Sequence, residues 1–263
     1  MDTGLEGKRG LIMGASAGMG NGIARSLAAE GVNLILTSRR NNILKAEAKY
    51  ISEKYGNSVE TFACDFSKDA DIERLLDFVE NQYGGVDIQF NNCGGPPRLL
   101  PSETSDQIWR EWFDIIVLAA IRITSLSLPH MKQKKWGRVI SMTSSNIYIA
   151  ATTNVLSTSL RMALVGWSKA LANEVAGDGI TVNCLVPGRI STDRLLEGDT
   201  SRASRAGVTP EQMRLKLVSQ SPLGRDGSVE EMANLATFLC SKQASYVTGS
   251  VIRADGGSIP VTL

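Results

Sequence analysis

GASAGMG, residues 14–20, is the stretch that decides the fold of this chain. It follows a short apolar run and precedes a regular helical pattern. Glycines in such a turn let backbone N–H groups approach a pyrophosphate, which then sits at the positive end of the helix. A glycine cluster alone is weak evidence, but its strand–turn–helix setting predicts a dinucleotide site. The residues expected to contact the dinucleotide here are Gly14, Ser16, Gly18, Met19 and Gly20.

Short β-rich runs alternate with helical patterns on both sides of this turn. The predicted strands are Arg9–Met13, Val32–Thr37, Ser58–Ala63, Val86–Asn91, Arg138–Met142, Ile180–Val186 and Ser250–Arg253. The predicted helices are Met19–Glu30, Ile43–Tyr55, Ala70–Tyr83, Ser105–Gln133, Val155–Val175, Pro210–Ser219 and Val229–Cys240. This alternation predicts an α/β Rossmann fold, a doubly wound seven-stranded parallel sheet with helices on both faces. Because no linker or internal repeat interrupts it, we expect one domain over residues 1–263.

Residues 188–227 break the alternation, because the chain becomes polar and rich in Ser, Thr, Gly and Arg. One helix is indicated inside this segment, with Thr209 as N-cap, Pro210 in the first turn and Gln212 completing a capping box. A polar insertion at the carboxyl end of a strand predicts a lid over a binding site. A plain surface excursion is the alternative.

Composition excludes several classes of function. The 263 residues carry 28 Lys and Arg against 27 Asp and Glu, so neither nucleic acid nor an anionic membrane is an expected partner. The polar N-terminus has no secretory pattern, and the apolar runs fall short of the roughly 20 residues of a membrane span. Four cysteines lie far apart, without a CxxC pair, which is typical of reduced thiols in a cytoplasmic protein. With a single histidine, His130, we expect no metal site.

The end of the second strand indicates which dinucleotide binds. It reads Thr37-Ser38-Arg39-Arg40, with no acidic residue before Glu47. NAD-preferring sites place an acid here for the ribose 2′-hydroxyl, whereas guanidiniums suit a 2′-phosphate. We therefore expect NADP(H) to be preferred over NAD(H), with Ser38, Arg39 and Arg40 as ligands. The alternative is a solvated arginine pair on a surface loop.

From about Gly7 to Gly257 the chain resembles the short-chain dehydrogenase/reductase superfamily, and its 3-oxoacyl-acyl-carrier-protein reductase-like branch in particular. The glycine motif matches at Gly14, Gly18 and Gly20, although Met13 stands where a Thr is usual. The family's C-terminal pattern is matched by residues 247–257. The resemblance adds further cofactor contacts: Asp65 with Phe66 near the adenine, the Asn91-Asn92-Cys93-Gly94 motif, Pro187-Gly188, and Ile190 with Thr192 near the nicotinamide.

The family's catalytic residues are a Ser, a Tyr and a Lys with a supporting Asn, and this chain departs from that set. The catalytic Ser matches Ser144, but the Tyr position falls on Ser157 and the Lys position on Arg161. The supporting Asn falls near Ile116. An aliphatic hydroxyl is a far weaker acid than a phenol, and a guanidinium stays protonated at any working pH. Ser157 could relay a proton through water and Arg161 could bind the cofactor ribose, or the pair could be purely structural.

A substitute proton donor is Tyr148, four residues beyond Ser144 in the loop after the fifth strand. An ordinary amphipathic contact for this ring is the alternative. His130, near the end of the long helix, is interpreted as structural. An apolar stripe on the helix of residues 155–175 fits either a subunit contact, implying a homo-oligomer and in this family a tetramer, or burial against the sheet. The stripe consists of Leu156, Leu160, Leu164, Trp167 and Leu171.

The resemblance implies an NADP(H)-dependent oxidoreductase that moves a hydride between the nicotinamide and a small carbonyl or alcohol substrate, of 3-oxoacyl type in the branch named. The alternative is a binding protein that has kept the nucleotide and lost fast chemistry. Arginines in the lid segment could meet an anionic substrate or simply form a mixed-charge surface with the neighbouring acids. They are Arg189, Arg194, Arg202 and Arg205.

Overall fold

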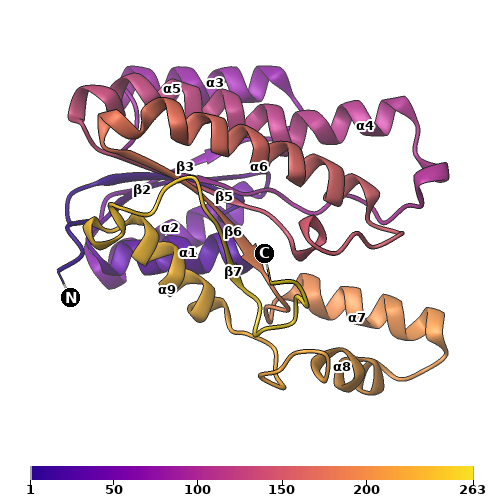
Figure 1. The fold of residues 1–263 in the computed structure, drawn as a ribbon. Helices are drawn as coiled ribbons and strands as arrows, with labels where there is room; N and C mark the ends of the chain where they lie inside the picture. The colour runs from indigo at the N-terminus through magenta and orange to yellow at the C-terminus, as the bar shows by residue number, and fades with distance from the viewer. Residues whose placement is uncertain (1, 263) are drawn as a thin grey trace.

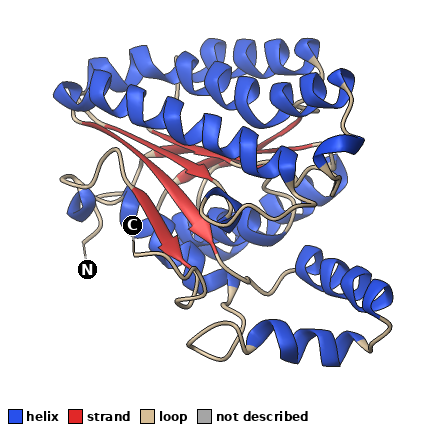
Figure 2. Ribbon diagram, turned by 45° about the vertical axis from the view of Figure 1, so that its right-hand side comes forward, coloured by secondary structure: helices blue, strands red, loops and turns tan. Residues whose placement is uncertain are grey.

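The computed structural model describes residues 2–262, and its seven strands form one parallel sheet. The strands lie in the order β3-β2-β1-β4-β5-β6-β7, with helices covering both faces (Figures 1 and 2). Their bounds are β1 Arg9–Met13, β2 Asn33–Ser38, β3 Val59–Ala63, β4 Ile88–Asn91, β5 Gly137–Met142, β6 Ile180–Pro187 and β7 Val251–Ala254. The predicted fold and all seven predicted strands are confirmed, with end shifts of one or two residues.

The helices form two layers because each presents one apolar face to the sheet. The helices α1 (Gly18–Ala29), α2 (Asn41–Tyr55) and α9 (Val229–Cys240) share one core. On the opposite face lie α3 (Asp69–Tyr83), α5 (Ala119–Lys134) and α6 (Val155–Val175) (Figure 1). Short 3₁₀ turns lie at Pro101–Glu103, Ser145–Ile147, Ala176–Asp178 and Lys242–Ala244. The central strands β4, β5 and β6 are buried on both sides, so the polar residues within them are buried as well.

The strand order places a topological switch beside β1, which pairs with β2 on one side and β4 on the other. Connections from these two neighbours run to opposite faces, so a crevice opens beyond their carboxyl ends. The glycine-rich turn leaves β1 at this crevice. The fold therefore puts the predicted dinucleotide turn where ligands bind in open α/β sheets.

The long predicted helix Ser105–Gln133 is interrupted by a π-helical turn. It divides into α4 (Asp106–Phe113), the π turn Asp114–Leu118, and α5. By length and a mean hydropathy of 1.5, the continuous run Asp106–Lys134 would be able to cross a membrane, and 39% of that apolar window is buried inside the fold. Part of the run packs on β4 and β5 as a core helix.

The segment 188–227 holds two helices where the sequence indicated one. The indicated helix is present as α8 (Pro210–Val218), with the predicted capping box between Thr209 and Gln212. The missed helix is α7 (Asp193–Ala206), which is mostly polar and contains a glycine. It packs against α8, and the two stand apart from the helical layers (Figure 1).

Candidate active site

The glycine-rich turn is shaped by close approaches that leave no room for side chains. Gly14 and Gly18 have φ angles of 65° and 57°, in the left-handed region. A Cβ on Gly14 would lie 2.7 Å from Nδ2 of Asn92, and one on Gly20 would lie 2.4 Å from the carbonyl oxygen of Gly14. The turn is therefore pressed against the start of α1, whose first N–H groups open toward the crevice.

Asn91 and Asn92 point to different places. Asn92 donates from Nδ2 to the carbonyl oxygen of Met13 at 3.3 Å and so joins the ends of β4 and β1. The Asn91 side chain is 2% exposed and bonds to Thr124 at 3.0 Å and Ser141 at 3.3 Å. Because the side-chain amide of Asn91 forms its hydrogen bonds inside the fold, only the backbone of this residue could contact a cofactor.

The predicted 2′-phosphate ligands gather above the glycine-rich turn, with one exception. Arg40 donates from Nε to Oγ of Ser16 at 3.0 Å, and its backbone N–H donates to Oγ of Ser38 at 3.1 Å. Ser16 and Ser38 are buried, whereas both arginines are exposed. Arg39 stands beside this group and makes no hydrogen bond to any residue in the range 2–262. Two hydroxyls and a guanidinium fit a phosphate that carries two charges.

The loop after β3 presents one of its two predicted ligands. Oδ1 of Asp65 accepts from the N–H and hydroxyl of Ser67, at 3.2 and 2.9 Å, and its side chain is half-buried. Phe66 packs in the core with Ile72 and is 8% exposed. The side chain of Phe66 is therefore part of the core, and of the two residues only Asp65 has a partly accessible side chain.

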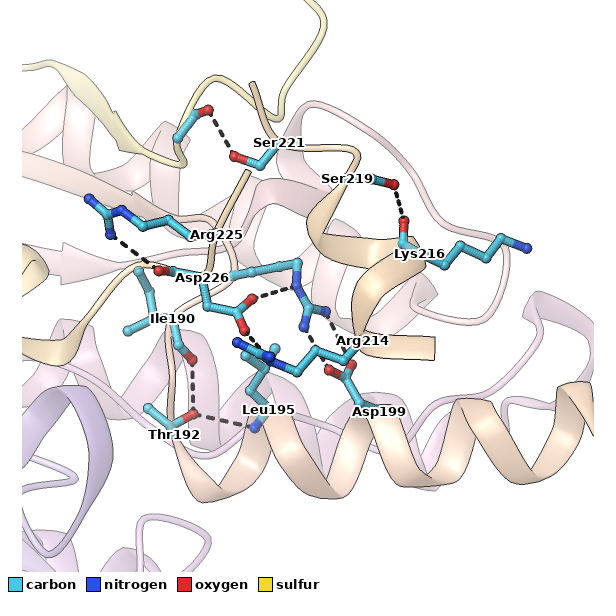
Figure 3. Close-up of polar contacts among 12 residues, drawn as sticks. Ile190, Thr192, Leu195, Asp199, Arg214, Lys216, Ser219, Ser221, Arg225 and Asp226 are labelled. Carbon is cyan, nitrogen blue, oxygen red and sulfur yellow. Dashed lines mark hydrogen bonds and ion pairs between the residues drawn. The ribbon is translucent and has the colours of Figure 1, made fainter. Parts of the chain in front are cut away.

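The segment after β6 brings the lid to the glycine-rich turn. A Cβ on Gly188 would lie 2.5 Å from Cα of Asp255, which fixes this glycine against the end of β7. Thr192 begins α7 by accepting the N–H of Leu195 at 3.3 Å (Figure 3). A Cβ on Gly18 would lie 3.5 Å from Cγ2 of Thr192, so the start of the lid touches the turn. Pro187 and Ile190 lie on the same connection, with Ile190 buried.

The candidate catalytic residues line the loop after β5 and the start of α6. Ser144 caps a 3₁₀ turn by accepting the N–H of Asn146 at 3.2 Å, and its side chain is half-buried. The ring of Tyr148 is also half-buried, and the guanidinium of Arg253 on β7 lies 5.5 Å from its centroid. Both hydroxyl-bearing residues therefore belong to one loop at the carboxyl edge of the sheet.

Ser157 and Arg161 are buried side chains one turn apart on α6. Arg161 is 6% exposed and donates from Nη1 to the carbonyl oxygen of Met142 at 2.7 Å. Its Nε is buried and has no partner among the described residues. It borders a cavity of about 10 Å³ that Ile116 of the π turn and Cys93 also line. The space is near the size of one water, which could satisfy Nε.

Burial keeps the cysteines protonated, and the histidine lies far from the candidate catalytic residues. Burial raises the pKa of Cys64 and of Cys240 to about 12. Burial also raises the pKa of Cys93, although the charge of Arg161 acts in the opposite direction. The Nε2 of His130 lies 3.2 Å from Oδ1 of Asp87, which precedes β4 at the opposite edge of the sheet. The structural interpretation of His130 agrees with this position.

An ion-pair network in the lid was not predicted. Arg189 binds Asp199 on α7 through two hydrogen bonds of 2.6 and 3.1 Å, and binds Asp226 at 2.8 Å. Asp226 also accepts from Arg214 on α8 at 3.1 Å (Figure 3). Burial alone would raise the pKa of Asp199, but the hydrogen bonds and charge of Arg189, together with Arg202, lower it below its ordinary value. Acidic and basic residues are interleaved in the sequence of the lid, so the sequence did not indicate which of them form ion pairs.

Comparison with known proteins gives the same family by three routes. Residues 14–258 match the family model described as enoyl-(acyl carrier protein) reductase. The chain is 33% identical over 257 residues to a 3-oxoacyl-[acyl-carrier-protein] reductase of Aquifex aeolicus, covering 98% of this chain and 99% of that one. It is also 33% identical to a D-beta-hydroxybutyrate dehydrogenase of Cupriavidus necator, covering 96% of this chain and 98% of that one.

Among solved structures, L-sorbose reductase from Gluconobacter frateurii, complexed with NADPH and L-sorbose, superposes with a TM-score of 0.93. The two chains are 31% identical, and the match covers 99% of this chain and 100% of the other. The sheet order, the glycine-rich turn and these relatives agree. The chain belongs to the enoyl-(acyl carrier protein) reductase family of the short-chain dehydrogenase/reductase superfamily, and it is an oxidoreductase.

Proposed function

We propose that this protein interconverts a carbonyl and an alcohol with NADP(H) as the coenzyme. The observation that carries the proposal is the group formed by Arg40, Ser16 and Ser38 directly above the glycine-rich turn. The L-sorbose reductase with which the chain superposes was solved with NADPH and a sugar. When bound, the coenzyme supplies or accepts the hydride at the substrate carbon.

In this proposal each element of the cleft holds one part of the dinucleotide. The pyrophosphate is held by the turn Gly14–Gly20 with Met19 at the first turn of α1, and the 2′-phosphate by Arg40 with Arg39 near it. Asp65 holds the adenine end. Asn92, Gly94 and the lid connection enclose the nicotinamide end, and Arg161 adds positive charge near the ribose. The connection contributes Pro187, Gly188, Ile190 and Thr192.

The substrate oxygen is held and protonated by side chains of the loop after β5 and of α6. The hydroxyl of Ser144 donates a hydrogen bond to the carbonyl oxygen and stabilises the charge that develops there. The proton comes from the phenol of Tyr148, or from a water held by Ser157 and Arg161. Tyr148 suits this role because it lies at the other end of the 3₁₀ turn that Ser144 caps, and a phenol is a far stronger acid than an aliphatic hydroxyl.

NADPH oxidation against ketones, aldehydes and 3-oxoacyl thioesters tests this proposal. We expect turnover with at least one class, and a loss of about 100-fold or more in kcat for Ser144→Ala. Tyr148→Phe separates the proton donors, because it slows the reaction only if the phenol is used. A folded protein that binds neither NADPH nor NADH in calorimetry would overturn the proposal.

A second function is favoured by the buried state of Arg161. Its Nη1 is committed to the carbonyl oxygen of Met142, and Ser157 has no acidic group to offer. The protein would then bind NADP(H) and respond to its redox state without fast chemistry. Tight NADPH binding without turnover, followed by turnover once Ser157→Tyr and Arg161→Lys are combined, supports this second function over the first.

The relatives extend the proposal to substrate, assembly and location. Two 3-oxo or 3-hydroxy acid enzymes share 33% identity with the chain, which supports a 3-oxoacyl-type substrate. We further propose a cytoplasmic homotetramer. Most of the apolar stripe on α6 is not available as its contact surface, because Leu156, Leu164 and Leu171 are buried inside one chain. Leu160 is also buried, at 5% exposed, but it borders a hollow on the outer surface.

A further inference from the structure

Four arginines from two distant segments converge beside the lid. Arg98 lies on the loop after β4, and Arg194, Arg202 and Arg205 lie on α7. Spacings of eight and three residues along a helix place the three on one side of α7, with Gly198 between them. A Cβ on Gly198 would lie 3.3 Å from Nη2 of Arg98 and 3.9 Å from Nη1 of Arg202.

The loop after β4 is held against α7 at a second point. Nη2 of Arg194 donates to the carbonyl oxygen of Gly95 at 3.4 Å. Gly95 and Arg98 therefore both lie against the helix, which brings the guanidinium of Arg98 close to those of α7. Arg98, Arg194 and Arg205 are exposed and Arg202 is half-buried, so the cluster is an accessible surface of one sign.

The local acids leave this positive charge uncompensated. Asp199 is bonded by Arg189 and shares one oxygen with Arg202 at 3.0 Å. Arg98, Arg194 and Arg205 form no ion pair in the part of the chain that the structure describes, and Asp193 and Glu197 are exposed on the adjoining face of α7. Partial burial, and then the charges of Arg202, Arg205 and Arg194, lower the pKa of Arg98. Like charges held this close favour the binding of an anion.

The position of the cluster distinguishes it from the cofactor's own phosphates. The pyrophosphate turn touches Thr192, the N-cap of α7. Arg194 is two residues further on, whereas Arg202 and Arg205 are ten and thirteen residues further on, or about 15–20 Å along a helix that rises 1.5 Å per residue. The cluster therefore begins at the border of the cofactor site, and its Arg202 and Arg205 end lies beyond the site proposed for the nicotinamide and the reacting carbonyl.

We infer that Arg98 and the Arg194–Arg202–Arg205 face of α7 bind an oxyanion, a carboxylate or a phosphate, at the end of the substrate remote from the reacting carbonyl. This inference rests on the proposed function. Guanidiniums bind both groups through paired hydrogen bonds. A free organic acid and a phosphopantetheine thioester are the two sources of such a group, and the experiment separates them.

Calorimetric titration of the NADPH-loaded protein at 0.15 M ionic strength, about physiological, tests the inference with two matched pairs. 4′-Phosphopantetheine is compared with pantetheine, and octanedioate with its dimethyl ester. We expect the anionic member of one pair to bind at least about 10-fold more tightly than its neutral counterpart. Preference in the first pair identifies a phosphate, and preference in the second a carboxylate.

The test variant combines Arg98→Ala and Arg205→Ala in one protein. Lys216→Ala is the control variant. Lys216 is an exposed cation of the same lid, on α8 (Figure 3). The double variant should lose the anionic preference and keep the affinity for the neutral ligand and for NADPH, whereas the control keeps the preference. Equal affinity for charged and neutral ligands, or an equal loss in the control, would overturn the inference. Failure to bind NADPH refutes the proposed function instead, and the same titrations without coenzyme then still test the cluster.

Discussion

Arg40 and Arg39 are adjacent and both exposed, yet the structure separates their roles. Arg40 is held over the glycine-rich turn by Oγ of Ser16, whereas Arg39 makes no comparable contact. We predict that Arg40→Ala weakens NADPH binding by about 10- to 100-fold and leaves NADH binding nearly unchanged, because only the 2′-phosphate loses a partner. Arg39→Ala should weaken NADPH binding less than Arg40→Ala does. Fluorescence titration of both variants with both coenzymes measures this, and equal losses for NADPH and NADH would contradict it.

Arg138 is a buried cation that forms no ion pair with a carboxylate of residues 2–262. It is 2% exposed at the start of β5 and donates to the carbonyl oxygens of Gly137 at 2.8 Å, Gly179 at 3.2 Å and Ser241 at 3.4 Å. We predict that Arg138→Met lowers the free energy of unfolding by about 2–4 kcal/mol, since these carbonyls lose a charged donor. Urea unfolding measures the change. Arg74→Ala, an exposed control on α3, should alter stability by less than about 1 kcal/mol.

At the level of single residues, the sequence indicated which segments lie at the cleft better than it indicated which side chains face it. The turn glycines, Ser16, Ser38 and Arg40 do gather, since strand ends at one edge must meet. Asn91 and Phe66 lie in the same motifs, but their side chains point into the core. Which way a side chain faces at the end of a strand depends on pairing register, and a motif does not specify it.

The lid helices are held to the sheet by ion pairs around Arg189. Because the pKa of Asp199 is lowered in the folded state, its contribution to stability is present above the unfolded value of about 3.9 and is lost as the pH falls through the lower folded value. We predict that Asp199→Asn lowers the Tm by roughly 4–8 °C at pH 7 and by much less near pH 3. Glu197→Gln, an exposed neighbour, is the control. An equal loss at both pH values would refute the prediction.

Two elements escaped prediction for opposite physical reasons. The π turn Asp114–Leu118 is apolar and periodic, so nothing in its sequence distinguishes it from an α-helix. The helix α7 has too few apolar residues to show a period, and contacts with α8 and the Arg189 pairs hold it. Both are set by tertiary contacts that a local pattern does not contain.

At the scale of the whole molecule, a hollow on the outer surface is a candidate subunit contact. It has a volume of about 460 Å³ and is lined by Trp109 and Phe113 of α4 and Leu160 of α6. Phe113 is 42% exposed. We predict that Phe113→Asp dissociates the proposed oligomer, because it would bury a charge in the contact. Light scattering after gel filtration measures the mass, and an unchanged oligomer would exclude this face. Tyr246→Ala is the control, a fully exposed aromatic elsewhere.

The sheet was the most predictable part of the molecule. Alternating apolar runs and helical patterns suffice for a parallel sheet, since right-handed crossovers leave few arrangements. The sequence contained no comparable pattern from which the contacts between subunits could be predicted. The apolar stripe on α6 was consistent with a subunit contact and with packing inside the chain. Its packing against the rest of the chain favours the second interpretation.

The two ends of the lid are joined to each other. Ile190 and Gly227 form an isolated parallel bridge, in which Ser191 donates to Gly227 and Gly227 to Arg189, both at 2.8 Å. Residues 191–226 are thus an excursion that leaves and returns at one point, much as an insertion in a surface loop does. Evolution could lengthen, shorten or replace the part beyond Thr192 while the nucleotide cleft stays intact, and a chimera carrying the corresponding segment of a relative should fold and acquire the donor's substrate preference.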